Sequence, residues 1–152
     1  PVDDFAREYL FTLLSINNFR WPQFEHGPVY LVGDIDLRPR DMAKVGQLFL
    51  QNGSWDGEQV VSQGWTETAT AEYISVDHGG YKGYRAYGYH WWLKTFNIDG
   101  QPYDAYHADG LAGQAIMVFP SVELVVVITG GNYDRPEMEH AIVASYVLPS
   151  VI

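Results

Sequence analysis

The chain has no cysteine, few basic residues and no long apolar run, and each absence excludes a class of protein. Without cysteine there is no disulfide framework, no thiolate nucleophile and no cysteine-ligated metal site. Nine lysines and arginines stand against 19 aspartates and glutamates. This balance argues against binding to nucleic acid or to an anionic membrane surface. No apolar segment is long enough to cross a bilayer, so we expect no membrane insertion by this segment.

Several familiar motifs are also missing. The sequence contains no Ser-x-x-Lys and no Gly-x-Ser-x-Gly, and its serines stand at expected turns, caps and helix ends, where local hydrogen bonding favours serine. The five histidines show no His-x-x-x-His or His-Glu-x-x-His spacing. The sequence therefore predicts no metal site and no cofactor. No carboxylate pair can be assigned to one face of an element, which leaves a glycosidase interpretation weak.

What the sequence does contain is an alternation of helical and extended patterns. With 152 residues, 47% of them hydrophobic, the chain can bury a sizeable core and forms one domain or part of one. Helical periodicity and capping residues predict helices at 3–14, 40–52, 62–70 and 135–148, the last with Pro136 in its first turn. Alternating and apolar runs predict an extended segment at 27–37 and strands at 86–94, 103–108, 114–120 and 122–130, with a loop at 73–87.

Single residues mark where some of these elements end. Pro39 stands near the start of the second helix, and Gly53 just past its end. Ser62 is expected to cap the helix at 62–70, and Asp56-Gly57 to form a tight turn. Because the helices come first and the strands late, the order is typical of an α+β fold, an antiparallel β-sheet flanked by helices. The helical region covers about 1–72 and the sheet with its C-terminal helix about 73–152.

The stretch "HADGLAGQAIMVFPSVELVVVITGGNY" is the most distinctive part of the chain. It resembles the third conserved element of the serine β-lactamase and penicillin-binding-protein superfamily, and in particular the class C β-lactamase-like hydrolases. The segments "DIDLRPRDMAKVGQLFLQNGSWDGEQVVSQGWTETAT" and "YGYHWWL" resemble the preceding helical region and strand of that family. The resemblance covers nearly the whole chain in the family's order. It implies a hydrolase acting on a β-lactam, a D-amino peptide or a small ester, and a bacterial periplasmic or secreted location.

The resemblance also assigns residues to a site. It implies catalytic roles for His107, beside the substrate, and for Gly110, whose amide would help to form the oxyanion hole, or Leu111 if the register differs by one residue. It places the substrate beside Asp109, Leu111, Gly113, Gln114 and Trp92. The alternative for His107 is a strand-end histidine bonded to solvent or backbone. For Gly113 and Gln114, shaping the start of the strand is the alternative to chemistry.

The departures from the family are equally informative. The family's Ser-x-x-Lys and Tyr-x-Asn motifs are missing, and Ser15-Ile16-Asn17 follows a helix, where it is not expected to replace them. We therefore expect the C-terminal part of a serine hydrolase, whose acyl-enzyme forms on a serine outside this chain and which is inactive alone. Its expected partners are the N-terminal portion of the same parent protein or a second copy, and a small-molecule amide or ester.

A second interpretation rests on the aromatic residues. Alternation along the expected strand at 86–94 puts Tyr87, Tyr89 and Trp91 on one face and His90 and Trp92 on the other. One face would belong to the core, and the other could wall a substrate cleft or hold a sugar ring. The alternative function is therefore a non-catalytic carbohydrate- or peptide-binding module.

Overall fold

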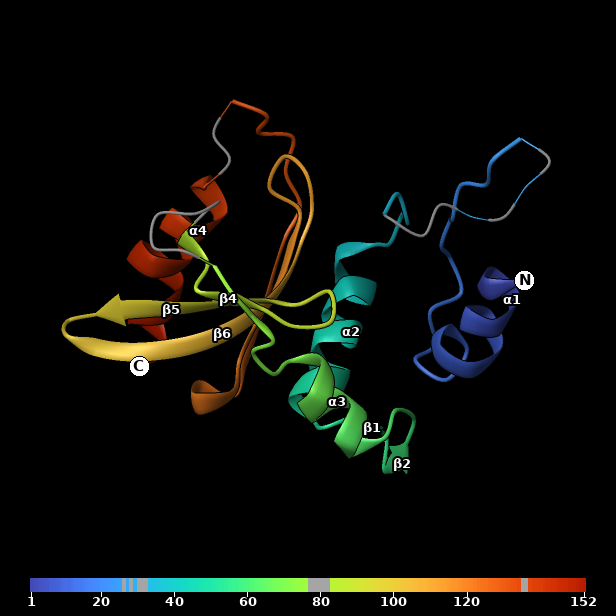
Figure 1. Ribbon diagram of the computed structural model, residues 1–152, viewed down its shortest axis with the longest axis horizontal. Coiled ribbons are helices and arrows are strands. Elements are labelled where there is room, and N and C mark those ends of the chain that lie inside the picture. The colour runs from blue at the N-terminus through green and yellow to red at the C-terminus, as the bar shows by residue number, and fades with distance from the viewer. Residues whose placement is uncertain (26, 28, 30–32, 77–82, 135–136) are drawn as a thin grey trace.

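The computed structural model describes residues 1–25, 27, 29, 33–76, 83–134 and 137–152 (Figure 1). Within these residues, six strands form one antiparallel sheet in the order β3-β4-β5-β6-β7-β8, and two further strands form a hairpin. The strands are β1 Ser54–Trp55, β2 Glu58–Gln59, β3 Ile74–Ser75, β4 Ala86–Tyr87, β5 Trp92–Ile98, β6 Gln101–Asp109, β7 Ala115–Phe119 and β8 Leu124–Ile128. The helices are α1 Val2–Ala6, η1 Arg7–Phe11, α2 Pro39–Leu50, α3 Gln63–Ala69, η3 Pro120–Val122, α4 Met138–Ile142, η4 Val143–Val147 and η5 Leu148–Ser150.

The sheet lies between α2 on one face and the C-terminal helices on the other (Figure 1). All five residues of β7 are buried, as expected of a strand with a helix on each face. Gly46 lets α2 approach closely, because a Cβ there would lie only 2.6 Å from Val125 Cγ1 and 2.8 Å from Ile116 Cγ2. On the opposite face, Val143 and Leu148 pack against the core residues of the sheet.

The N-terminal helices α1 and η1, with the residues that follow them, form a second hydrophobic cluster with α2. Phe11, Leu14 and Ile16 pack with Leu48, so the helix expected at 3–14 lies beside the helix expected at 40–52. The cap at Ser62 is present, since its hydroxyl accepts a hydrogen bond from the Trp65 amide at 3.3 Å. Among the described residues, no helix combines the length and the apolar character that crossing a membrane requires.

Strand β8 forms one edge of the sheet. It pairs with β7 along its whole length and, within the described residues, with no other strand. Its sequence, Leu-Val-Val-Val-Ile, is entirely apolar, yet every residue of it is only half-buried. An apolar edge strand offers unpaired backbone groups to another strand.

The antiparallel α+β fold and the strands expected at 103–108, 114–120 and 122–130 are confirmed. The strand expected at 86–94 was wrong: the chain turns between β4 and β5, where the Gly88 amide donates to Trp91 O at 2.8 Å and His90 adopts a φ of +63°. The end of α3 fixes this turn, because Tyr89 N donates to Ala69 O at 2.9 Å. The expected alternation of Tyr87, Tyr89 and Trp91 against His90 and Trp92 fails for the same reason.

The loop expected at 73–87 contains the short strands β3 and β4, which pair with each other. The extended segment expected at 27–37 lies partly outside the described residues, as does Pro136. The described ends of that segment form isolated bridges from Val29 to Gln23 and from Asp36 to Arg20.

Candidate functional site

Strand β6 ends at Asp109, and residues 110–114, which we call the β6 turn, reverse the chain into β7. The Gly110 amide donates to Gln114 O at 2.8 Å and closes the turn. Ala112 and Gly113 both have left-handed backbones, with φ of +61° and +88°. Glycine adopts such a backbone without cost, whereas alanine does so rarely, so the surrounding structure must hold Ala112 in place.

The segment after β8 provides that support. Asn132 N donates to Ala112 O at 2.9 Å, and the Gln114 side-chain amide donates to Gly130 O. Gly130 is required at this contact, since a Cβ would lie 2.9 Å from Ala112 O. This contact is consistent with the shaping role suggested as an alternative for Gln114, and substrate contact by Gln114 stays a prediction.

The two backbone amides considered for an oxyanion hole differ in their surroundings. The Gly110 amide donates to Gln114 O within the turn, and its role in an oxyanion hole stays a prediction. The Leu111 amide has no acceptor among the described residues. Leu111 is 74% exposed, so this residue lies at the surface of the molecule. The geometry therefore favours the register shifted by one residue.

His107 occupies the face of β6 that packs against the C-terminal helices. Its side chain has 0% exposure, and its ring stacks on Phe96 at 5.8 Å with an interplanar angle of 3°. The rings of Tyr84 and His140 meet it edge-on at 5.4 and 5.3 Å. A direct substrate contact, as predicted for His107, would require this packing to open.

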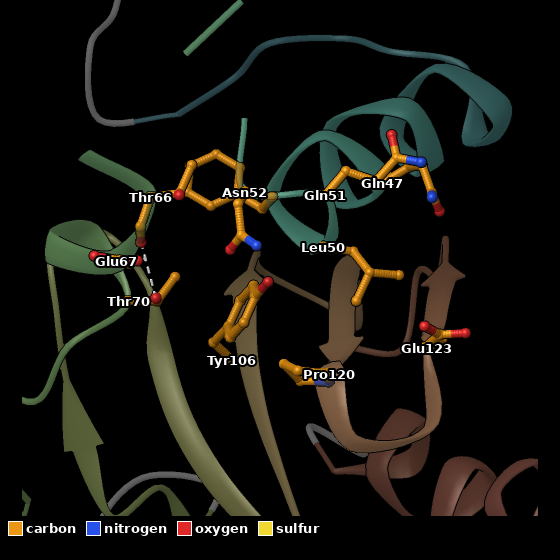
Figure 2. Close-up of a pocket in the computed structure, with 11 residues that line it drawn as sticks. Gln47, Leu50, Gln51, Asn52, Thr66, Glu67, Thr70, Tyr106, Pro120 and Glu123 are labelled. Atoms are coloured by element: carbon orange, nitrogen blue, oxygen red, sulfur yellow. Dashed lines mark hydrogen bonds between the residues drawn. The ribbon is translucent and has the colours of Figure 1, made fainter. Parts of the chain in front are cut away.

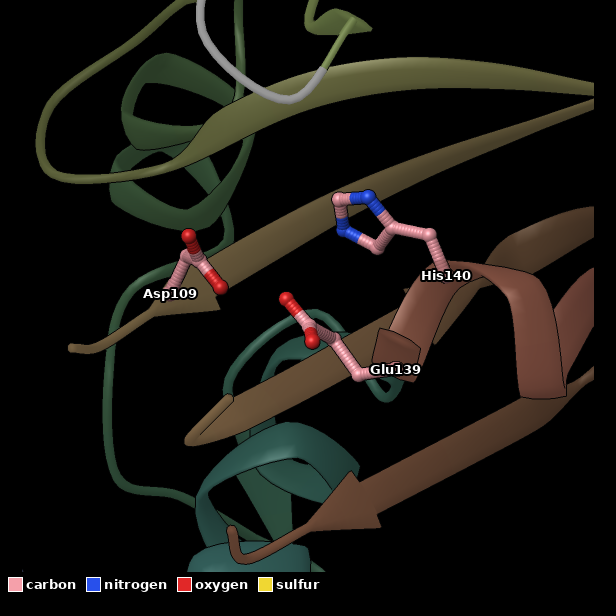
Figure 3. A group of neighbouring side chains, drawn as sticks. All are labelled: Asp109, Glu139 and His140. Atoms are coloured by element: carbon pink, nitrogen blue, oxygen red, sulfur yellow. The ribbon is translucent and has the colours of Figure 1, made fainter. Parts of the chain in front are cut away.

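A cluster of ionisable side chains lies beside His107 (Figure 3). Asp109 at the end of β6 and Glu139 and His140 at the start of α4 each offer a ligand atom within 4.8 Å of the others. His140 Nε2 lies 3.2 Å from the Tyr84 hydroxyl, and its Nδ1 lies 3.1 Å from Lys94 Nζ. The family resemblance predicted only Asp109 of these five. No spacing signals the others, because 46 and 56 residues separate Lys94 and Tyr84 from His140.

Trp92, a predicted substrate contact, is part of an aromatic cluster at the start of β5. Its ring stacks on Tyr84 at 4.9 Å and meets Tyr87 at 4.4 Å. A second aromatic stack is open to solvent: Tyr89 lies between Trp65, at 5.8 Å, and Tyr73, at 4.7 Å. The turn between β4 and β5 is what brings Tyr89 to this surface.

Comparison with known proteins gives partial but consistent likenesses. No protein-family model matches the sequence. The 6-aminohexanoate-dimer hydrolase of Paenarthrobacter ureafaciens is 29% identical over 116 residues, which are 71% of this chain and 27% of that protein. A Bacillus anthracis structure provisionally named as a 6-aminohexanoate-dimer hydrolase matches 96% of this chain and 36% of its own, with a TM-score of 0.73 and 22% identity. The octameric penicillin-binding protein homologue of Pyrococcus abyssi matches 97% of this chain and 37% of its own, with a TM-score of 0.68 and 17% identity.

The chain has the β-lactamase-like fold. The sequence likeness to a hydrolase and the fold shared with a penicillin-binding protein homologue both fit a β-lactamase-like hydrolase. The chain spans about a quarter of the curated relative's length, 27%, and 36% and 37% of the two structures. The likeness therefore concerns one part of such a hydrolase.

The β-lactamase-like chain also has a groove on the α2 face of its sheet (Figure 2). Its volume is about 600 Å³, within the range of small-molecule sites. The groove is lined by Gln47, Phe49, Leu50, Gln51, Asn52, Thr66, Glu67, Thr70, Tyr106, Pro120 and Glu123. Among the described residues that line it, two carry carboxylates and none is basic. The groove lies beside the turn between β7 and β8. The β6 turn, which joins β6 to β7, lies at the other end of β7.

Ionisation of the Tyr106 phenol at this groove should make the stability of the fold depend on pH. Burial raises the pKa of its phenol well above the ordinary value of about 10. The pKa of this phenol is higher in the folded than in the unfolded state. The neutral phenol therefore contributes its full stabilisation of the fold below about pH 10, and this contribution is lost as the pH rises further. Between about pH 10 and pH 12, the wild type should therefore lose more thermal stability than Tyr106→Phe, measured as Tm by circular dichroism.

The control for this prediction is Tyr103→Phe, which removes a hydroxyl from the same strand. Its Tm should fall with pH as steeply as that of the wild type. Equal pH dependence in the wild type and Tyr106→Phe would contradict the prediction.

Proposed function

We propose that the chain is the C-terminal part of a β-lactamase-like serine hydrolase that cleaves an amide or ester. The observation that carries the proposal is the Leu111 amide, which has no acceptor among the described residues and lies in a turn fixed by Asn132 and Gln114. A rigidly held N–H at the surface suits an oxyanion hole, because it requires no rearrangement when negative charge develops on the substrate oxygen.

The reaction requires groups from outside this chain. A serine Oγ attacks the substrate carbonyl, a base accepts the serine proton, and the amine or alcohol leaves with a proton. Water then cleaves the acyl-serine, releasing the acid and restoring the serine hydroxyl. The chain has no Ser-x-x-Lys, so we assign the serine and its base to an N-terminal portion of the same protein. Within this chain, His107 becomes a positioning residue that packs beneath the end of β6.

The substrate class follows from the relatives' names and from the resemblance of the motif. A 6-aminohexanoate dimer is joined by an amide, and two of the similar proteins carry that name. A β-lactam, a D-amino peptide and a small ester share the same carbonyl chemistry. We therefore propose an amide or ester of a small molecule and do not narrow the substrate further.

Strand β8 supports the assignment of the missing groups to another polypeptide. Its half-buried apolar residues and its free edge suit pairing with a strand from the N-terminal portion or from a second copy. We therefore expect the chain to be stable only with such a partner. A cooperatively melting monomer at micromolar concentration in sedimentation and melting experiments would contradict this expectation.

One observation favours a different function. The stack of Trp65, Tyr89 and Tyr73 is exposed, as in surfaces that bind sugar rings or peptides. A non-catalytic binding module would use this stack and would need no serine. Binding of an oligosaccharide or peptide that Trp65→Ala abolishes, without any hydrolysis by the completed protein, would favour this alternative.

The deciding experiment is complementation with an activated substrate. The chain alone should give no burst of product with a nitrophenyl ester or a chromogenic β-lactam, because it lacks the nucleophile and its base. Addition of an N-terminal portion that carries Ser-x-x-Lys should produce a burst equal to the amount of complex formed. The matched control replaces that serine with alanine and should give complex without a burst.

Two results would overturn the proposal. One is a burst, or stoichiometric labelling of a serine, in the chain alone, which would direct attention to Ser15. The other is a folded complex, verified by sedimentation and circular dichroism, that hydrolyses neither type of substrate.

A further inference from the structure

We propose that Asp109, Glu139 and His140 form a binding site for one divalent transition-metal ion, with Zn²⁺ as the best-matched ion. Figure 3 shows the three side chains turned toward one another between the end of β6 and the start of α4. Their ligand atoms all lie within 4.8 Å of one another. The inference is independent of the proposed hydrolase activity, because all three residues belong to this chain.

Burial distinguishes this cluster from the acidic groups at the surface. Glu139 is 1% exposed and His140 is 5% exposed, while Asp109 is half-buried at the open side of the cluster. Two of the three donors are thus shielded from water, and a cation interacts more strongly with buried donors than with donors at the surface. The half-buried position of Asp109 leaves a side from which an ion can enter.

The donor types select the ion. One imidazole and two carboxylates form a mixed nitrogen and oxygen set, which Zn²⁺ accepts readily, whereas Ca²⁺ and Mg²⁺ prefer oxygen ligands alone. A tetrahedral Zn²⁺ site with ligand distances of about 2.0–2.2 Å separates its donor atoms by roughly 3.4 Å. The three donors therefore need to close in by about an ångström, which rotations of the side chains can provide. A fourth position is left for water.

The surroundings of His140 determine how an ion would enter. Its Nε2 is in contact with the Tyr84 hydroxyl and its Nδ1 with Lys94 Nζ, so an ion must replace one of the two. The remaining contact would then orient the ring as an outer partner of the ligand. Lys94 carries a positive charge beside the same ring, and this charge repels a metal ion, so its removal should tighten metal binding.

An ion at this cluster would also fasten the β6 turn to α4. Glu139 already meets the turn, since a Cβ on Gly113 would lie 3.3 Å from Glu139 Oε2. Asp109 immediately precedes the turn in sequence. Metal binding would therefore hold the Leu111 amide more rigidly without touching a substrate.

The experiment measures metal binding directly. The chain, in complex with its N-terminal portion, is stripped with a chelator and titrated with Zn²⁺ by calorimetry and with Co²⁺ by visible absorption. We expect one ion per chain and the intense visible bands of low-coordinate Co²⁺. Asp109→Asn, Glu139→Gln and His140→Gln should each weaken binding by at least about tenfold, and Lys94→Met should tighten it by about tenfold.

Matched controls lie on the same elements. Asp104→Asn changes an exposed aspartate of β6, and Glu137→Gln an exposed glutamate beside α4. Both should bind metal like the wild type. If Glu139→Gln or His140→Gln fails to fold by circular dichroism, two variants still test the proposal: the higher metal affinity expected of Lys94→Met and the lower affinity expected of Asp109→Asn, whose side chain is only half-buried. Absence of stoichiometric binding by the folded wild type would overturn it, as would equal affinities in cluster and control variants.

Discussion

Replacing Leu111 with proline is expected to lower kcat of the complete hydrolase by about 10²–10³-fold, the usual effect of losing one oxyanion-hole donor. Proline removes the backbone N–H, and the Leu111 amide has no acceptor among the described residues, so the fold loses no described hydrogen bond. The preceding residue, Gly110, tolerates the backbone that proline imposes on its neighbour. The measurement is steady-state hydrolysis of an activated ester by the complex with the N-terminal portion.

The control keeps the amide and changes only the side chain. Leu111→Ala removes a side chain that is mostly exposed, so both kcat and stability should stay close to the wild-type values. If the two variants lose activity equally, the side chain and not the amide is responsible. If Leu111→Pro retains full activity while it remains folded, the assignment of Leu111 to the oxyanion hole is wrong.

The second large effect concerns the end of α2. Gly53→Ala is expected to lower the free energy of unfolding by about 2–5 kcal/mol, the sum of a left-handed backbone cost and a steric clash. Gly53 has a φ of +83°, and a Cβ there would lie 1.9 Å from Val61 O and 2.7 Å from Val61 C. Backbone atoms cannot rotate away as a side chain can. The hairpin after α2 must therefore shift, although Gly53 O accepts hydrogen bonds from the amides of Val60 and Val61.

Gly57 provides a control with the same backbone and a different environment. Its φ is +84°, and no atom lies within 4 Å of the position its Cβ would occupy. Gly57→Ala should therefore cost only the backbone term, about 1–2 kcal/mol. Urea denaturation followed by tryptophan fluorescence compares the two variants. Equal losses would show that the contact with Val61 is unimportant.

Elements that depend on neighbouring residues were predictable from the sequence. The helix at 40–52 was marked by Pro39 and Gly53, and the next by its cap at Ser62, whose hydroxyl bonds to an amide three residues away. The strands β6, β7 and β8 followed from apolar and alternating runs. These signals are local, because capping hydrogen bonds and side-chain periodicity involve residues only a few positions apart.

Tertiary contacts decided what the local signals could not. The turn between β4 and β5 depends on Ala69 O at the end of α3, about which the sequence around Tyr89 contains no information. The motif resemblance left two amides open for the oxyanion hole. The Gly110 amide donates to Gln114 O within its own turn, whereas the Leu111 amide has no acceptor among the described residues, and this contrast is the basis for proposing Leu111.

In the candidate site, too, some residues were predictable from the sequence and others were found only in the tertiary structure. The sequence drew attention to His107 and Asp109, but the packing of α4 against the sheet placed His107 in the core and brought Glu139 and His140 beside Asp109. Lys94 joined them from β5, 46 residues away from His140. The sequence by itself determined the fold class, most element positions and the motif that resembles the superfamily. Only the tertiary structure decided which groups meet and which are exposed, because burial and contact between distant residues are set by how helices and sheet pack together.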